Sequence, residues 1–127
     1  MHTRKINAPD APGPVGGYSQ AVEIANASRV LFISGQIPVS ADGTVPSGFR
    51  EQARVAWANV EAQLKAAGMS LDNVVKHTTF LADRKYGGEN GHVRREVFGE
   101  LRPALTVVVA GIFDEAWLLE IEAIAAA

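Results

Sequence analysis

Glu120 and Glu122 lie in an otherwise apolar run near the end of the chain, where a carboxylate can orient or deprotonate a water molecule. The run favours a strand over residues 117–125, and strand alternation places both glutamates on one face, opposite Leu119 and Ile121. A buried carboxylate without a partner is costly, so the alternative is that one or both face solvent or pair with Arg or Lys. Of the two glutamates, Glu120 is the stronger candidate for catalysis.

Ser34-Gly35 is a second candidate, because it follows the apolar run of residues 30–33. A glycine at such a turn lets a ligand approach closely, and the turn can aim backbone N–H and C=O groups at that ligand. A strand-end turn without any ligand accounts for the same residues. Tyr18, which follows a flexible glycine pair, is either a ligand contact or an aromatic residue of the core or an interface.

The composition excludes several other chemistries. The chain has 127 residues, no cysteine and a formal net charge of -2, so thiolate catalysis is excluded and nucleic acid is an unfavoured partner. His2, His77 and His92 lack metal-ligand spacing, and we interpret His77 as a structural residue of a strand; no metal or cofactor is expected. No Gly-x-Ser-x-Gly elbow or phosphate loop occurs. Without a signal peptide or an apolar run long enough to span a membrane, the expected location is cytoplasmic.

One α+β domain over residues 1–127 must position these side chains. The first helix has apolar residues at spacings of three and four, with Ser47 as its expected cap and Gly68 as its left-handed stop. Pro103 prevents continuation of the second helix. The expected order is β-β-α-β-α-β-β, with strands over 18–24, 29–33, 73–80, 106–110 and 117–125, helices over 48–67 and 90–101, and an optional strand near residues 4–6.

The first two strands are expected to form a hairpin across the turn at residues 26–28. Two helices of this size cover only one face of a sheet with five or six strands. The other face must meet something else, and a second copy of the chain is the simplest partner. Four apolar residues are available for that contact: Val107, Val109, Leu119 and Ile121.

Several motifs in order resemble the Rid family, also called the YjgF/YER057c/UK114 or endoribonuclease L-PSP family. They are Gly16-Gly17-Tyr18-Ser19-Gln20-Ala21-Val22, Ser34-Gly35-Gln36-Ile37-Pro38, Ala66-Ala67-Gly68, Asn90 with Phe98, Pro103-Ala104 and Glu120-Ile121-Glu122-Ala123-Ile124-Ala125. The resemblance implies a chorismate-mutase-like fold and a homotrimer with three clefts between its subunits. Its best-studied members hydrolyse reactive enamines and imines. It further implies that Glu120 handles the hydrolytic water and that the cleft is lined by Tyr18, Ser34, Gly35 and Asn90.

Leu105 departs from the family pattern at a position that matters for substrate choice. By the resemblance, an arginine directly after Pro-Ala holds the substrate carboxylate through two hydrogen bonds, and leucine has neither charge nor donor. The sequence therefore predicts that Leu105 contacts a ligand other than the usual 2-imino acids. Arg102 would have to approach from a different direction to replace the missing cation.

Three functions remain open. The first is a small-molecule hydrolase of the Rid type that acts on an enamine, imine or related compound. The second is a noncatalytic ligand-binding or regulatory trimer that has kept the cleft. The third is an RNA-cleaving protein, which the net charge of -2 and the lack of an aromatic and basic surface stretch disfavour.

Overall fold

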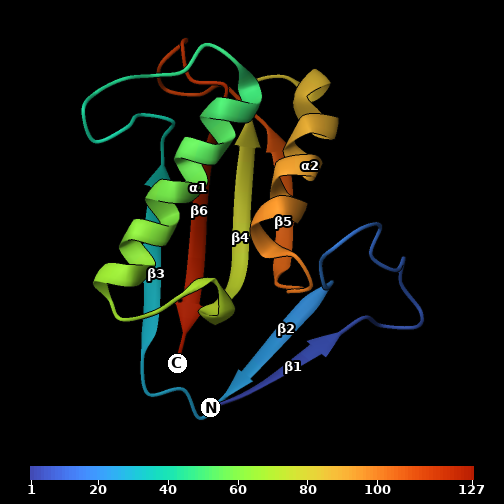
Figure 1. The fold of residues 1–127 in the computed structure, drawn as a ribbon. Coiled ribbons are helices and arrows are strands. Elements are labelled where there is room, and N and C mark those ends of the chain that lie inside the picture. The colour runs from blue at the N-terminus through green and yellow to red at the C-terminus, as the bar shows by residue number, and fades with distance from the viewer.

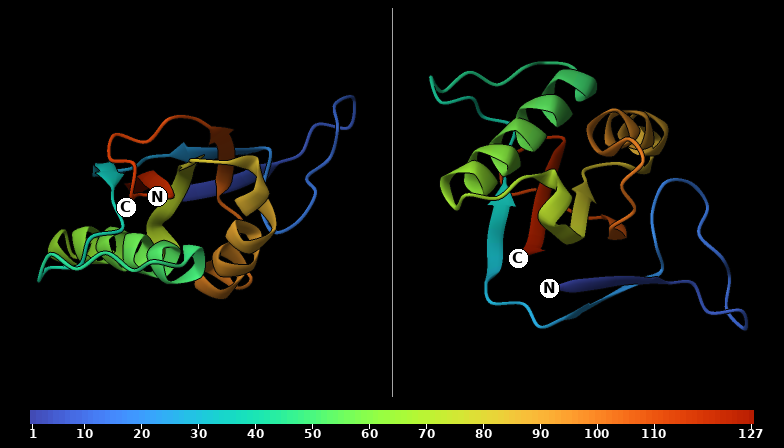
Figure 2. Two further views of the ribbon diagram at one scale, coloured as in Figure 1. Left: turned by 90° about the horizontal axis from the view of Figure 1, so that it is seen from above. Right: turned by 60° about the horizontal axis from the view of Figure 1, so that its bottom comes forward.

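A four-stranded sheet lies at the centre of the molecule, and two helices cover one of its faces (Figures 1 and 2). The computed structural model describes residues 1–127. The strand order is β3-β6-β4-β5, in which β5 is parallel to β4 and the other pairs are antiparallel. The elements are β3 (Val30–Gln36), α1 (Phe49–Ala66), β4 (Val74–Leu81), α2 (Gly87–Phe98), β5 (Ala104–Val109) and β6 (Leu119–Ala126), with short 3-10 turns η1 (Leu71–Asn73) and η2 (Arg84–Tyr86). This is an α+β fold.

The N-terminal strands form a separate hairpin. β1 (His2–Ile6) pairs antiparallel with β2 (Ala21–Ala25), so the optional strand near residues 4–6 is confirmed. The hairpin predicted across the turn at residues 26–28 is wrong, because the strand after that turn, β3, pairs with β6 and not with β2. Asn26, which has a φ of 60°, turns the chain between β2 and β3. Residue propensities predicted that both segments are strands, but they do not specify which strand pairs with which.

Helix α1 has the apolar face that its sequence predicts. Phe49, Ala53, Ala56, Val60 and Leu64 are all buried on it. The helix ends in a Schellman motif, in which the N–H of Gly68 donates to Lys65 O at 2.9 Å and the N–H of Met69 donates to Leu64 O at 2.8 Å. Gly68 has a φ of 72°, which confirms it as the left-handed stop.

The predicted cap of α1 and the predicted bounds of α2 are wrong. The N-cap of α1 is Gly48, without a side-chain hydrogen bond, so Ser47 does not cap it. Helix α2 runs from Gly87 to Phe98, so it begins and ends three residues earlier than the expected range of 90–101. The side chain of Asp83 accepts a hydrogen bond from Lys85 N at 2.9 Å, so η2 is capped and runs directly into α2.

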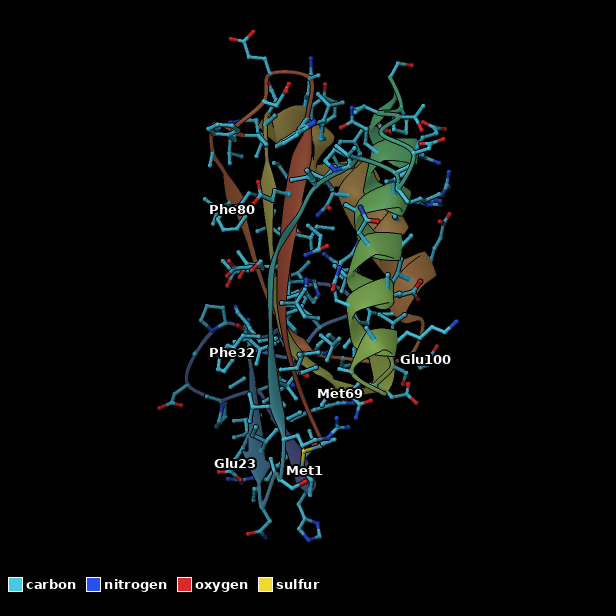
Figure 3. The ribbon with its side chains drawn as sticks, turned by 90° about the vertical axis from the view of Figure 1, so that its left-hand side faces the viewer. Met1, Glu23, Phe32, Met69, Phe80 and Glu100 are labelled. Carbon is cyan, nitrogen blue, oxygen red and sulfur yellow. The ribbon has the colours of Figure 1, made fainter.

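The two faces of the sheet differ sharply in burial. The core lies between sheet and helices, and Leu119 and Ile121 are 0% exposed within it, so the expectation that they face a second copy is wrong. Val107 and Val109, also expected there, are 41% and 47% exposed at the outer strand β5. The opposite face has no covering layer, and Phe32 and Phe80 project from it (Figure 3). Phe32 is 74% exposed.

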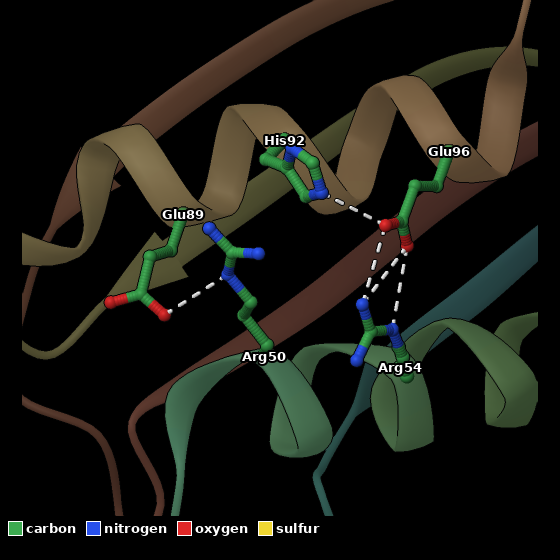
Figure 4. A network of polar contacts seen from close by, with 5 residues as sticks. All are labelled: Arg50, Arg54, Glu89, His92 and Glu96. Atoms are coloured by element: carbon green, nitrogen blue, oxygen red, sulfur yellow. Dashed lines mark hydrogen bonds and ion pairs between the residues drawn. The ribbon is translucent and has the colours of Figure 1, made fainter.

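An exposed polar network joins the two helices (Figure 4). Glu96 accepts hydrogen bonds from Arg54 and lies 2.9 Å from His92 Nε2, while Arg50 pairs with Glu89 at 3.5 Å. These contacts with Arg54 hold the pKa of Glu96 below its usual value. Because the five side chains are 43–48% exposed, these contacts add little to the stability of the fold. Neither helix has the length and apolarity that crossing a lipid bilayer requires.

Candidate functional site

The predicted site residues fall into two clusters in the single chain. Glu120 and Gly35 form the first, on the open face of the sheet. Glu120 is opposite Phe80 in the β6–β4 pairing, and the strand alternation predicted for Glu120 and Glu122 is confirmed because Leu119 and Ile121 are buried on the other side.

Gly35 lies directly under the carboxylate of Glu120. A Cβ at position 35 would overlap the Oε2 atom of Glu120, so only glycine leaves room for this arrangement. The β3–β6 register shifts between Ile33 and Gln36, which brings Gly35 to this point. The space beside Gly35 is therefore taken by the Glu120 carboxylate, and the close approach of a ligand to Gly35 stays a prediction. The carbonyl of Ser34 accepts a hydrogen bond from Gln36 Nε2 at 2.9 Å, so that group is already engaged.

A shallow cleft of about 500 Å³ opens beside Glu120. Its lining is Phe80, Ala110, Gly111, Ile112, Phe113, Glu120 and Glu122. Neither glutamate takes part in any of the five ion pairs of the chain, so pairing with Arg or Lys does not explain them. Glu122 faces solvent, whereas Glu120 is half-buried. Glu120 is thus an unpaired carboxylate at the wall of a cleft, which is the arrangement a general base requires.

Tyr18 and Asn90 belong to the second cluster, between α2 and the start of β5. Ser19 fixes the position of Tyr18, because its N–H donates to Pro103 O at 3.1 Å and its Oγ donates to Arg102 O at 2.6 Å. The Tyr18 hydroxyl accepts a hydrogen bond from Val15 N at 3.1 Å, which leaves its own proton free for another acceptor. Asn90, on the inner face of α2, is 3% exposed.

Leu105 lies on the far side of the sheet from Glu120. It pairs with His77, which is buried under the helices, whereas Glu120 faces the open side. Two strand spacings across and three residues along the sheet place the two Cα atoms roughly 14 Å apart. The structure does not bring Leu105 and Glu120 together within one chain.

His77 is a core residue, as expected. Its ring stacks on Phe98 at 5.0 Å between centroids and meets the edge of Trp57 at 5.1 Å. Burial, followed by the charges of Arg94 and Lys76, lowers the pKa of His77 to about 3. Both ring nitrogens lack a hydrogen-bond partner, so the neutral imidazole acts as an aromatic filler.

Arg94 is the residue that sequence reasoning missed. It was not among the candidate residues, yet it is only 8% exposed, whereas its neighbour Arg95 is exposed. Burial, with Arg95 adding to it, lowers the pKa of Arg94 from its usual value. The available signal was spacing, because Arg94 is one turn from both Asn90 and Phe98 and must share their face.

Arg102 is engaged locally and leaves little to offer a ligand. Its Nη1 donates to Gly99 O at 2.9 Å and to Leu101 O at 3.0 Å, and its Nη2 lies 3.6 Å from Glu100. The guanidinium therefore holds the turn between α2 and β5.

Comparison with known proteins gives one consistent result. The sequence model of the endoribonuclease L-PSP family matches residues 8–127. A RutC family protein of Pyrococcus horikoshii is 41% identical over 118 residues, which cover 91% of each chain. The 2-iminobutanoate/2-iminopropanoate deaminase of Mus musculus is 37% identical over 122 residues, covering 94% of this chain and 88% of the other.

Solved structures show the same relationship. A protein of unknown function of the conserved Rid family, YyfB from Yersinia pestis, superposes with a TM-score of 0.85 at 26% identity over 100% of both chains. TdcF of Escherichia coli with bound serine gives a TM-score of 0.74 at 34% identity over 98% of both chains.

Proposed function

Because this chain belongs to the Rid family, whose sequence model it matches from residue 8 to residue 127, we propose that it hydrolyses a small imine or enamine. Water adds to the C=N carbon, and collapse of the resulting carbinolamine gives a carbonyl compound and ammonia. The observation that carries this proposal is Glu120, an unpaired carboxylate seated over Gly35 at the wall of a cleft. The similarity to a mammalian imine deaminase supports the reaction class.

Glu120 acts as the general base in this reaction. It takes a proton from water as the oxygen attacks the imine carbon and gives that proton to the imine nitrogen, which forms the carbinolamine. It then takes the hydroxyl proton of the carbinolamine and gives it to the amine nitrogen, so that ammonia leaves as the carbonyl forms. A carboxylate can both accept and donate the proton, provided that no ion pair with a cation keeps it deprotonated. Gly35 holds the carboxylate against the main chain and limits the directions from which it can reach the water.

We further propose that the complete site forms between copies in a homotrimer. Within one chain, the Glu120 cluster and the residues Tyr18, Asn90 and Leu105 lie in separate places, and the open face carries the exposed Phe32. A second copy seated on that face would bring one cluster of each kind together and cover apolar surface. The family resemblance supports a trimer.

Two other functions are less well supported. Leu105 offers no charge to a ligand, which favours a noncatalytic ligand-binding or regulatory trimer as the main alternative. RNA cleavage finds little support in a chain with a net charge of -2, although the matched family model carries the word endoribonuclease in its description.

The test is turnover by Glu120→Gln beside the matched control Glu122→Gln. Ammonia release is measured with 2-iminobutanoate generated in the cuvette and with a neutral imine. Glu120→Gln should lose at least about a hundredfold in kcat, the range that general acid–base catalysis contributes, while its oligomeric state and ligand binding stay unchanged. Glu122→Gln, altered on an exposed neighbour, should retain wild-type turnover.

The alternatives give different results. Full activity of Glu120→Gln would remove the proposed base. Ligand binding by the wild type without any turnover would identify a binding protein, and strongly salt-dependent RNA binding would favour the RNA-cleaving function.

A further inference from the structure

Arg94 is a buried cation that has no anion within its own chain. Its side chain is 8% exposed, it takes part in none of the five ion pairs, and its Nε makes no hydrogen bond. Removing a charge from water without a partner is costly. An anion from outside the chain that pairs with Arg94 would offset this free-energy cost.

Two glycines lie beside the guanidinium of Arg94. A Cβ at Gly16 would lie 3.4 Å from Arg94 Nη2, and one at Gly91 would lie 3.9 Å from the same atom. Nη2 and the unpartnered Nε form the edge with which arginine holds a carboxylate by two parallel hydrogen bonds. On the Gly91 side the guanidinium of Arg95 also lies close, with its Nη1 3.1 Å from the position of such a Cβ.

The covering segment is attached at a few points. Residues 7–20 loop out from the β1–β2 hairpin and return beside the start of β5 (Figure 1), where Ser19 is bonded to Arg102 and Pro103. Gly16, which borders Arg94 Nη2, has a φ of 109°, a backbone conformation that favours glycine.

The neighbours of Arg94 are the residues expected to contact a ligand. Asn90 precedes it by one helical turn on the same buried face, and Tyr18 comes two residues after Gly16, which borders Arg94 Nη2. Phe98, one turn after Arg94 on α2, stacks on His77, which pairs with Leu105 across β4 and β5. Arg94 and Leu105 therefore lie on the same, helix-covered side of the sheet.

We propose that Arg94 binds the carboxylate of a small ligand, so that this site accepts a 2-imino or 2-oxo acid although Leu105 offers no charge. The proposal rests on the proposed function for the identity of the ligand, and it replaces the expectation from Leu105 alone that the ligand lacks an anion. The free hydroxyl proton of Tyr18 supplies a further hydrogen bond to the same group. Arg94 is a binding residue that sets specificity, and Glu120 remains the base.

The other cations of this region are less suitable. Arg102 is engaged with backbone carbonyls, Lys76 Nζ donates to Thr106 Oγ1, and Arg95 is exposed. A carboxylate from a neighbouring copy of the chain is the competing anion. The experiment below separates it from a ligand.

Binding of 2-oxobutanoate and of its uncharged amide is measured by calorimetry for the wild type, Arg94→Gln and the matched control Arg95→Gln. The wild type should prefer the acid. Arg94→Gln should bind the acid about tenfold to a hundredfold more weakly and the amide unchanged, which is the range for a charge-assisted contact. Arg95→Gln removes a neighbouring charge but leaves the Arg94 guanidinium in place, so it should keep the preference for the acid over the amide.

A second measurement requires no variant to fold. In the wild type, the NMR resonance of Arg94 Nε should shift on titration with 2-oxobutanoate and stay in place with the amide. Arg94→Lys keeps the charge without the fork and should retain part of the preference for the acid.

Several results would overturn the proposal. They are an unmoved Nε resonance, equal loss of acid and amide binding in Arg94→Gln, or no preference for the acid in the wild type. Loss of the oligomer in Arg94→Gln with ligand preference intact would assign the anion to a partner subunit. Because only binding is measured, these results do not depend on turnover, and loss of the Glu120 mechanism would leave them interpretable.

Discussion

The buried imidazole of His77 should make the protein less stable as the pH falls below about 6.5. The pKa of His77 is about 3 in the folded chain against 6.5 for the free side chain. Between these values the unfolded chain takes up a proton that the folded chain does not, so acidification favours unfolding. Stability from this residue is complete above pH 6.5 and is lost as the pH falls toward 3.

The magnitude follows from the shift. Each pKa unit corresponds to about 1.4 kcal/mol, so the contribution approaches about 5 kcal/mol over the whole range. Between pH 7.5 and pH 5.0 the expected loss is about 2 kcal/mol in the free energy of unfolding. That window lies above the pKa of the carboxylates that hydrogen bonding depresses, such as Glu96, whose stabilisation is lost only below about pH 4.5.

The assay is urea unfolding at both pH values and one protein concentration, because self-association would make stability depend on concentration. His77→Leu removes the titrating ring and its two unpartnered nitrogens at similar volume, so stability at pH 7.5 should change by less than about 1.5 kcal/mol. The loss of stability at pH 5.0 should disappear in this variant. His92→Gln, a change to an exposed histidine, should keep that loss. An equal loss in His77→Leu, or none in the wild type, would refute the reasoning.

Two further predictions concern residues that shape the cleft. Gly35→Ala should reduce turnover at least about tenfold, because the added methyl group displaces the Glu120 carboxylate. The end of the Glu120 side chain is flexible, so the free energy of unfolding should change by no more than about 2 kcal/mol. Wild-type turnover in this variant would show that the contact of Glu120 with Gly35 is unimportant. Gln52→Leu should lower the free energy of unfolding by about 3 kcal/mol in urea titrations. The Gln52 amide donates to Pro46 O and Ala116 O and accepts from Leu118 N–H. Without this side chain, these buried backbone groups have no hydrogen-bond partner. The exposed Gln63→Leu on the same helix is the control for Gln52, and an equal effect in both variants would contradict this account.

Local signals in the sequence predicted the elements well. The three- and four-residue spacing fixed the buried face of α1, Gly68 fixed its end, and period-two alternation placed Glu120 opposite Ile121. These features depend on residues within one or two turns of each other, and side-chain geometry repeats with the same period. The predicted bounds of α2 were wrong. The cap at Asp83 starts a 3-10 turn that runs into the helix, and the apolar spacing of an α-helix does not indicate such a turn.

Partners across the chain could not be predicted in the same way. Nothing local distinguishes β1 from β3 as the neighbour of β2, since both have strand-forming residues at a suitable distance. Leu119 and Ile121 were placed on the open side of the sheet because alternation defines two faces without saying which of them the helices cover.

The amino-acid sequence by itself determined the order of the elements, the class of fold, the family resemblance and two candidate groups, the Ser34-Gly35 turn and the carboxylate of Glu120. Only the tertiary structure decided that Gly35 serves Glu120, that Leu105 faces away from it, and that Arg94 is enclosed without a counter-charge. The reason is physical: charge and backbone freedom are properties of single residues, whereas burial and proximity arise only when distant segments pack together.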